Sequence, residues 1–306
     1  MRNVLCSVNL VFPPLSNQEA DWLSKDKEVQ EVLAQSKLYM LAQREEVFFD
    51  DFETDEKNET FSFYLKKSKK KSSKFTINYG GILRELDIKD QGGCIKTGKK
   101  IIKISLDDGT VPFWLTPDKV ILDFNIGFKY LSMDKECDLN VFWSFDLLYI
   151  GISRKDDSLT RLFRKPHQRR LDILTNAKNS GVNSRVSDEL MIFFFDVDFQ
   201  SINIIDSECN LSDIGYSPKK ERVINDVEKA FINIMEPEYN KQMYKKYPLS
   251  TDGLFSKDEN IQKCSYKINE NIVFTTDKQI FKCDSDIIYV TSNKIEIKRP
   301  FGKLVQ

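Results

Sequence analysis

The chain has 306 residues, enough for two or three compact units of roughly 100–200 residues each. Its apolar share of 41%, with 22 Phe and 11 Tyr, can supply hydrophobic cores and excludes a wholly disordered chain. Charged residues make up 30%, yet the formal net charge is only −1. Any contact with nucleic acid must therefore come from a local basic surface.

No segment approaches the roughly 20 consecutive apolar residues of a membrane-spanning helix, so we expect no membrane partner. Residues 1–22 contain a short apolar run but no cleavage site of small residues. We interpret Val4 to Val11 as a strand of the fold and expect a cytoplasmic protein.

The cysteines and the single histidine restrict the chemistry. The six cysteines show no CxxC or CxxH spacing, which excludes zinc ribbons and thioredoxin-type redox pairs. With His167 as the one imidazole, any mechanism that needs two histidines is also excluded.

The first third of the chain is rich in strand patterns. The segment 18–41 suits one or two amphipathic helices that Ser16 can cap. Strands are predicted over 61–67 and 74–80, joined by a basic hairpin tip that contains Lys69, Lys70 and Lys71. This tip is either a solvated loop or a finger that contacts phosphates.

Asp108-Gly109 predicts a hairpin within 99–115, and 115–131 is expected to form a turn and another apolar strand. We therefore predict that residues 1–133 form a mixed, β-rich domain for target recognition or partner binding.

The pattern changes after Cys137. The runs 139–145 and 147–153 predict an antiparallel hairpin around Asp146, and 188–198 predicts a buried strand. Helices are expected after Ser158, over 167–181, and over 219–235 before Pro237. Short alternating runs follow from Ser265. The expected order over 134–250 is β-β-α-β-α, with sequential strands as neighbours, followed by a short β appendix over 251–306.

Glu228 lies at the margin of the apolar stripe of the helix 219–235. Ile224, Val227, Phe231 and Ile234 define this stripe. A carboxylate in that position costs several kcal/mol of desolvation unless it is compensated. A salt bridge to an Arg of a neighbouring helix and a metal ion at a cleft both remain open.

Tyr239 and Asn240 follow the helix directly, where Asn240 could also simply cap a turn. Upstream, Gly151 interrupts a run of large residues, which indicates a bend or the close approach of another group. Tyr149 precedes Gly151 by two residues, so both should face the same side of the sheet.

Arg161 and His167 come from the helical region that follows. An arginine binds two phosphate oxygens with its planar guanidinium and stays charged at any working pH. Arg164, Arg169 and Arg170 flank Arg161 and make this segment a candidate nucleic-acid-binding surface. An ordinary solvated basic helix is the alternative.

Taken together, these motifs resemble the GIY-YIG nuclease family. The resemblance covers about residues 139–248. It rests on Tyr-Ile-Gly at 149–151, Arg161-Leu162, His167, Ile173-Leu174, the apolar run 190–195, and the spacing from Glu228 to Asn240. It implies an α+β fold with a small antiparallel sheet flanked by helices. It also implies hydrolysis of a nucleic-acid phosphodiester with one Mg²⁺ or Mn²⁺.

The resemblance also implies roles for single residues. Glu228 would hold the metal, and Arg161 would stabilise charge in the transition state. His167 would contact a phosphate or support the nucleophile. Tyr149 would position or deprotonate the attacking water, and Asn240 would orient Glu228 or a phosphate.

One motif departs from the family. Its first tyrosine is expected on the preceding strand, around Asn140 to Phe145, where no tyrosine occurs. Tyr149 acting alone, or a substitute in Tyr130 or Tyr216, remains open.

We therefore expect an endonuclease acting on double-stranded DNA, as in restriction or phage defence. The alternative is a non-catalytic nucleic-acid-binding or sensing protein built on a decayed nuclease domain. A homo-oligomer or a defence-system partner protein remains open.

Overall fold

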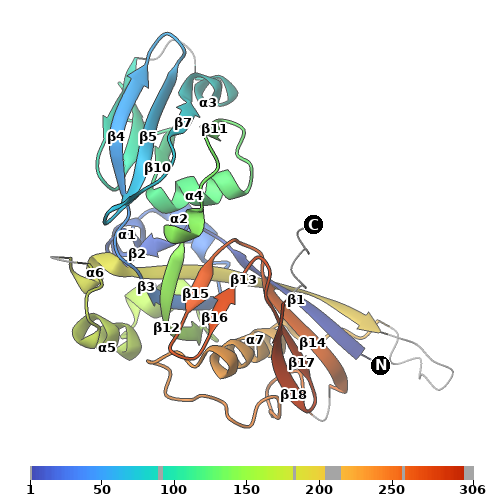
Figure 1. Cartoon of the computed structure of the whole chain (residues 1–306). Helices are drawn as coiled ribbons and strands as arrows, with labels where there is room; N and C mark the ends of the chain where they lie inside the picture. The colour runs from blue at the N-terminus through green and yellow to red at the C-terminus, as the bar shows by residue number, and fades with distance from the viewer. Residues whose placement is uncertain (1, 89–91, 182–183, 204–214, 257–258, 300–306) are drawn as a thin grey trace, which may run out of the picture. The chain divides into compact units, whose positions relative to one another are not determined.

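The computed structural model describes residues 2–88, 92–181, 184–203, 215–256 and 259–299 (Figure 1). The chain divides into two compact units. Unit 1 comprises Met1–Arg44, Ser144–Lys178 and Arg185–Gln306, and unit 2 comprises Glu45–Trp143 and Asn179–Ser184. The units are interleaved in the sequence, whereas the three expected domains were consecutive segments.

Unit 1 is built on one large mixed sheet. The strand order is β16-β15-β12-β3-β13-β1-β14-β17-β18, and β2 pairs with β13. Most neighbours are antiparallel, but β1 with β14 and β12 with β15 are parallel. The strands are β1 (Arg2–Leu10), β2 (Leu15–Ser16), β3 (Leu38–Gln43), β12 (Ser144–Ile152), β13 (Leu190–Asn203), β14 (Ile261–Ile268), β15 (Val273–Thr275), β16 (Ile280–Lys282), β17 (Ile287–Thr291) and β18 (Lys294–Lys298).

The helices of unit 1 begin at sequence signals of known type. Ser16 and Glu19 form a capping box at the start of the first helix, and Asp26 caps the second. The predicted long helix 219–235 is confirmed. The helices are α1 (Asn17–Leu23), α2 (Lys27–Leu33), the π-helical η2 (Thr160–Arg164), α5 (Gln168–Asn176), α6 (Val186–Glu189) and α7 (Lys220–Met235).

The strands β12, β3 and β13 lie side by side in this sheet (Figure 1). All six residues of β3 are buried, because β3 is central and is covered on both faces. Tyr39 and Leu41 on one face of β3 join a core cluster with Leu162 and Ile173, which come from the η2 and α5 region. This face of the sheet positions the candidate site.

Unit 2 contains two smaller sheets. One has the order β11-β7-β5-β4, with β6 on β5, and the other has the order β10-β9-β8. The predicted basic hairpin and the hairpin around Asp108-Gly109 are confirmed. The elements are β4 (Phe48–Asp55), β5 (Thr60–Lys67), β6 (Lys70–Lys71), β7 (Phe75–Asn78), α3 (Tyr79–Glu85), β8 (Gly93–Thr97), β9 (Ile102–Leu106), β10 (Phe113–Leu115), α4 (Pro117–Asn125), β11 (Leu131–Met133) and η1 (Leu139–Val141).

The expected fold class is wrong. The structure is mostly β, and the sheet that carries the site has ten strands in mixed directions, so it is not a small antiparallel sheet flanked by helices. The cause is long-range pairing. The N-terminal β1 and the C-terminal β14–β18 belong to the same sheet as β12 and β13, and do not form a separate domain and appendix.

Three local predictions also fail. The expected hairpin over 139–153 is the 3-10 turn η1 followed by the single strand β12, whose antiparallel partner is β3. The apolar strand expected within 115–131 is the helix α4, which Thr116 caps with Pro117 in its first turn. The helical segment 18–41 ends at Leu33, and Leu38 begins β3.

Within the described residues, no helix is both long enough and apolar enough to span a membrane.

Candidate active site

Two tyrosines face each other on adjacent strands. Tyr39 on β3 pairs in register with Gly151 on β12, and the rings of Tyr39 and Tyr149 lie 6.1 Å apart between centroids. A Cβ atom at Gly151 would lie 2.7 Å from the Tyr39 hydroxyl and 2.7 Å from the Tyr149 ring. Only glycine leaves room for both phenols here. The predicted close approach at Gly151 is therefore confirmed.

Tyr39 lies on the strand next to β12, whereas the segment Asn140 to Phe145 holds no tyrosine. The strand that pairs antiparallel with β12 is β3, not the segment Asn140 to Phe145, because the Glu45–Trp143 part of unit 2 is inserted between the two strands in the sequence. The other candidates lie elsewhere. Tyr130 belongs to unit 2, and the Tyr216 ring lies under the guanidinium of Arg2 at 3.7 Å.

His167 connects the tyrosines to a helix start. It is the N-cap of α5, where its Nδ1 accepts a hydrogen bond from the backbone N–H of Arg170 at 3.0 Å. The neutral ring then carries its proton on Nε2, which donates to the Tyr39 hydroxyl at 2.8 Å. The ring of Tyr39 in turn lies beside that of Tyr149, and its hydroxyl acts to lower the pKa of Tyr149. His167 and Tyr39 thus form a hydrogen-bonded pair next to Tyr149.

The electrostatic environment keeps His167 neutral and favours the protonated form of both tyrosines. Burial, followed by the charges of Arg161 and Arg170, lowers the pKa of His167 to about 4, so its imidazole is neutral at pH 7. Burial raises the pKa of both Tyr39 and Tyr149, while the Arg161 guanidinium acts in the opposite direction on both phenols. Arg161 therefore favours the phenolate form of both tyrosines, and Arg169 adds a smaller effect in the same direction on Tyr149.

Arg161 comes from the π-helical turn η2. Its Nη1 donates to the carbonyl oxygen of Pro166 at 3.1 Å, which orients the guanidinium close to His167. The structure thus brings Arg161, His167 and Tyr149 together, although each comes from a different element. π-helical turns are uncommon and occur frequently at functional sites.

Glu228 lies on α7, which packs against β12. Burial raises its pKa to about 7, against the opposing effects of Arg154 and Lys229. Across the described part of the chain, no Lys or Arg lies within ion-pair distance of Glu228. Lys229 and Arg154 pair with Asp252 instead. A salt bridge therefore does not explain this carboxylate.

Glu228 also acts on the tyrosines. Its charge raises the pKa of Tyr149, where it is the largest cause after burial, and it raises the pKa of Tyr39. The acid, the two phenols and Arg161 are therefore close enough for their charges to interact, because charge interactions weaken with distance.

Asn240 holds the outer edge of β12. Its side-chain oxygen accepts from the Ile150 N–H at 2.9 Å, and its amide nitrogen donates to the Ile150 carbonyl at 2.8 Å. The backbone N–H of Tyr239 adds a bond to the Leu148 carbonyl at 3.0 Å. Asn240 thus replaces a neighbouring strand and fixes the position of the segment that carries Tyr149 and Gly151.

Glu228 fits a metal that needs few protein ligands. No group of three or more His, Cys, Asp or Glu side chains suited to a metal occurs among the residues described here. Mg²⁺ usually keeps several waters and is often held by one or two carboxylates together with substrate phosphates. A largely buried carboxylate with a raised pKa and no ion-pair partner is suited to that mode of binding.

The residues predicted to bind nucleic acid are dispersed. Arg164 is exposed, and Arg169 forms an ion pair with Asp172 at 2.7 Å. Arg170 is directed inward, with bonds to Asn17 at 2.7 Å and to the Leu162 carbonyl at 3.3 Å. Arg170 therefore supports the fold around the start of α5.

The lysines of the basic hairpin lie in unit 2. Lys69 and Lys70 are exposed, while Lys71 bonds to Asp51 and lies over the Tyr64 ring at 4.1 Å. The hairpin therefore presents two unengaged ammonium groups, and its third lysine is held by its neighbours.

Sequence reasoning missed Tyr39 and four residues near Glu228, namely Arg154, Lys229, Tyr244 and Asp252. A signal for Tyr39 exists in the continuous apolar run 38–42, which suits a buried strand better than the end of an amphipathic helix. For Tyr244, the signal is its place among the lysines of 241–246.

Comparisons with protein-family models, with curated proteins and with solved structures found no match to this chain.

Proposed function

We propose that unit 1 is a metal-dependent nuclease that hydrolyses phosphodiester bonds in nucleic acid, with double-stranded DNA as its substrate. The proposal includes a distant relationship to GIY-YIG nucleases, with unit 2 inserted between the strands that carry the two tyrosines. The observation that carries the proposal is the convergence of Tyr39, Tyr149, Arg161, His167 and Glu228, from five separate elements, on one site.

The neighbours of Tyr149 support a role for it as the proton acceptor. The Tyr39 ring lies beside Tyr149, and His167 Nε2 donates to the Tyr39 hydroxyl at 2.8 Å. Tyr39 and the charge of Arg161 both favour the phenolate of Tyr149, against the effects of burial and of the Glu228 charge. The phenolate can accept a proton from water while the water oxygen bonds to phosphorus and the bond to the leaving oxygen breaks.

Arg161 suits the stabilisation of charge on the phosphate, because its planar guanidinium binds two oxygens and stays charged. Glu228 would hold Mg²⁺ or Mn²⁺, which when bound offsets charge on the phosphate and on the leaving oxygen. Since the Glu228 charge raises the pKa of Tyr149, offsetting that charge also favours the phenolate.

The alternative, a non-catalytic binding or sensing protein, was based on the absence of a second tyrosine. Tyr39 supplies that second tyrosine next to Tyr149. The geometry therefore favours the enzyme.

Nicking of supercoiled plasmid DNA in Mg²⁺ or Mn²⁺ tests the proposal. Tyr149→Phe and Arg161→Ala should each slow nicking by about a hundredfold or more, which is the scale expected for loss of a general base or of a charge-stabilising donor. Tyr64→Phe, in unit 2, is the control and should nick at the wild-type rate. Equal rates for all four proteins would refute the assignment. Binding of DNA with no cleavage in either metal would support the non-catalytic alternative.

A further inference from the structure

A second feature lies next to Glu228, namely an open pocket of about 1110 Å³ formed by Arg154, Lys229 and the segment 241–256. We call it the basic pocket. Its charged lining residues are Arg154, Lys229, Lys241, Lys245, Lys246 and Asp252. Five cations against one acid make it a strongly positive hollow in a chain whose net charge is −1.

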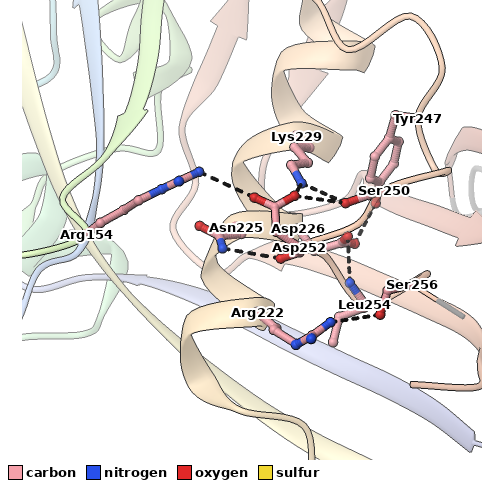
Figure 2. Close-up of polar contacts among 10 residues, drawn as sticks. All are labelled: Arg154, Arg222, Asn225, Asp226, Lys229, Tyr247, Ser250, Asp252, Leu254 and Ser256. Atoms are coloured by element: carbon pink, nitrogen blue, oxygen red, sulfur yellow. Dashed lines mark hydrogen bonds and ion pairs between the residues drawn. The ribbon is translucent and has the colours of Figure 1, made fainter. Parts of the chain in front are cut away.

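Residues of α7 form hydrogen bonds to the segment 247–256, which forms one wall of the pocket (Figure 2). Asp226, which is fully buried, accepts bonds from the Tyr247 hydroxyl at 2.7 Å and from the Leu254 N–H at 3.0 Å. Arg222 donates to Ser256 at 2.8 Å and Asn225 to the Asp252 carbonyl at 3.3 Å. The wall is therefore preorganised, so a ligand would not have to order it.

The one acid in the pocket is already engaged. Lys229 bonds to Asp252 and, at 2.7 Å, to Ser250, and Arg154 approaches Asp252 at 3.5 Å (Figure 2). The three remaining lysines of the lining are Lys241, Lys245 and Lys246. All three are exposed, and within the described ranges none of them forms an ion pair. Their positive charge is thus available to an anion.

Three residues connect the pocket to the candidate active site. Lys229 lines the pocket and directly follows Glu228 on α7. Arg154 lines it two residues after the end of β12, the strand that carries Tyr149, and Tyr244 lines it as well. A polyanion whose reacting phosphate lies at Glu228 would therefore extend into the basic pocket.

We propose that the basic pocket binds the phosphates of the DNA strand on one side of the scissile bond, an inference that rests on the proposed nuclease function. Phosphate contacts by Lys and Arg position a duplex without reading its sequence. Tyr244 adds an aromatic ring to the lining, and grooves that bind nucleic acid often combine aromatic rings with positive charges.

Binding without cleavage tests this proposal. The probe is a 5′-fluorescein-labelled DNA duplex, and its fluorescence anisotropy is measured with the full-length protein in Ca²⁺ over a range of salt concentrations. The variant is Lys245→Glu/Lys246→Glu. The matched control is Lys263→Glu/Lys278→Glu, which makes the same change in net charge at two exposed lysines of unit 1.

The pocket variant should bind at least tenfold more weakly than the control, and the slope of log K against log salt should fall by about 2. Equal affinity and equal slopes for the two variants would overturn the pocket assignment, even if the wild type nicks plasmid. Weaker binding by the pocket variant alone would support it, even if the wild type nicks nothing and the nuclease proposal fails.

Discussion

At the residue scale, the charge of Glu228 lowers the stability of the fold. Burial raises its pKa from the usual 4.5 to about 7. Between these two values the unfolded chain has lost the proton that the folded chain keeps, so stability falls as the pH rises through this window. A binding site for a cation is a reason to retain such a group.

Glu228→Gln should therefore stabilise the protein at pH 8 by up to about 3 kcal/mol, because a shift of one pKa unit corresponds to roughly 1.4 kcal/mol. Below about pH 4.5 the gain should vanish, since both states of the wild type are then protonated. Urea denaturation without divalent metal, at pH 4 and at pH 8, measures the difference. Glu221→Gln, on the exposed first turn of α7, is the control. A gain that is the same at both pH values would contradict this account of Glu228.

At the scale of elements, the outer edge of β12 depends on one side chain. Asn240 satisfies both backbone groups of Ile150, and Asn240 itself is only 7% exposed. A strand edge that lacks a neighbouring strand needs such a partner, because buried backbone groups without hydrogen bonds are costly. The element that carries Tyr149 therefore depends on the turn after α7.

Asn240→Ala should lower the free energy of unfolding by about 2–4 kcal/mol, since two buried groups lose their partners. Asn176→Ala provides a control, because the Asn176 side chain bonds to the Asp172 carbonyl on the exposed surface of α5. Thermal denaturation gives the size of the effect, and hydrogen exchange at Ile150 gives its location. Unchanged protection of the Ile150 amide would contradict the role assigned to Asn240.

The elements that follow strong local patterns were predictable. α7 carries a full apolar stripe and ends before Pro237, and β13 is a continuous apolar run. β3 was missed because a short apolar run next to a helix carries no periodicity of its own. For α4, the Thr116-Pro117 start was the better signal, but the apolar run Val120 to Leu122 resembled a strand.

The site was predictable where its residues are close in sequence. Arg161 and His167 are near neighbours, and the conflict between the charge of Glu228 and its apolar surroundings is visible in the helix pattern. The pairing of Tyr39 with Tyr149 was not predictable, even though the run 38–42 indicates a strand, because the Glu45–Trp143 part of unit 2 separates the two tyrosines in the sequence. No local pattern specifies which strand pairs with which across such an insertion.

At the scale of the molecule, unit 2 interrupts unit 1 at a strand connection. Gln43 at the end of β3 pairs with Asp146 near the start of β12, so the two strands could be joined by a short turn. Insertions at such connections are tolerated when the ends of the segment lie close together. We propose that unit 2 supplies target recognition.

Replacing residues 45–143 by a short Gly/Ser linker should leave the pair of Tyr39 and Tyr149 intact. The shortened protein should fold and should still nick plasmid in Mg²⁺ or Mn²⁺, but it should lose any preference among DNA targets. Circular dichroism and comparison of the cleavage products with those of the wild type measure these outcomes. A folded protein that no longer nicks would show that unit 2 completes the site.

The most direct test of the central claim is the single-turnover rate of plasmid nicking by Glu228→Gln at saturating Mg²⁺ or Mn²⁺. The claim is that Glu228, Tyr149, Tyr39, His167 and Arg161 form one metal-dependent nuclease site. It predicts that the wild type nicks only with metal, that Glu228→Gln is slower by about a hundredfold or more, and that Glu221→Gln matches the wild type. Nicking by Glu228→Gln at the wild-type rate would contradict it.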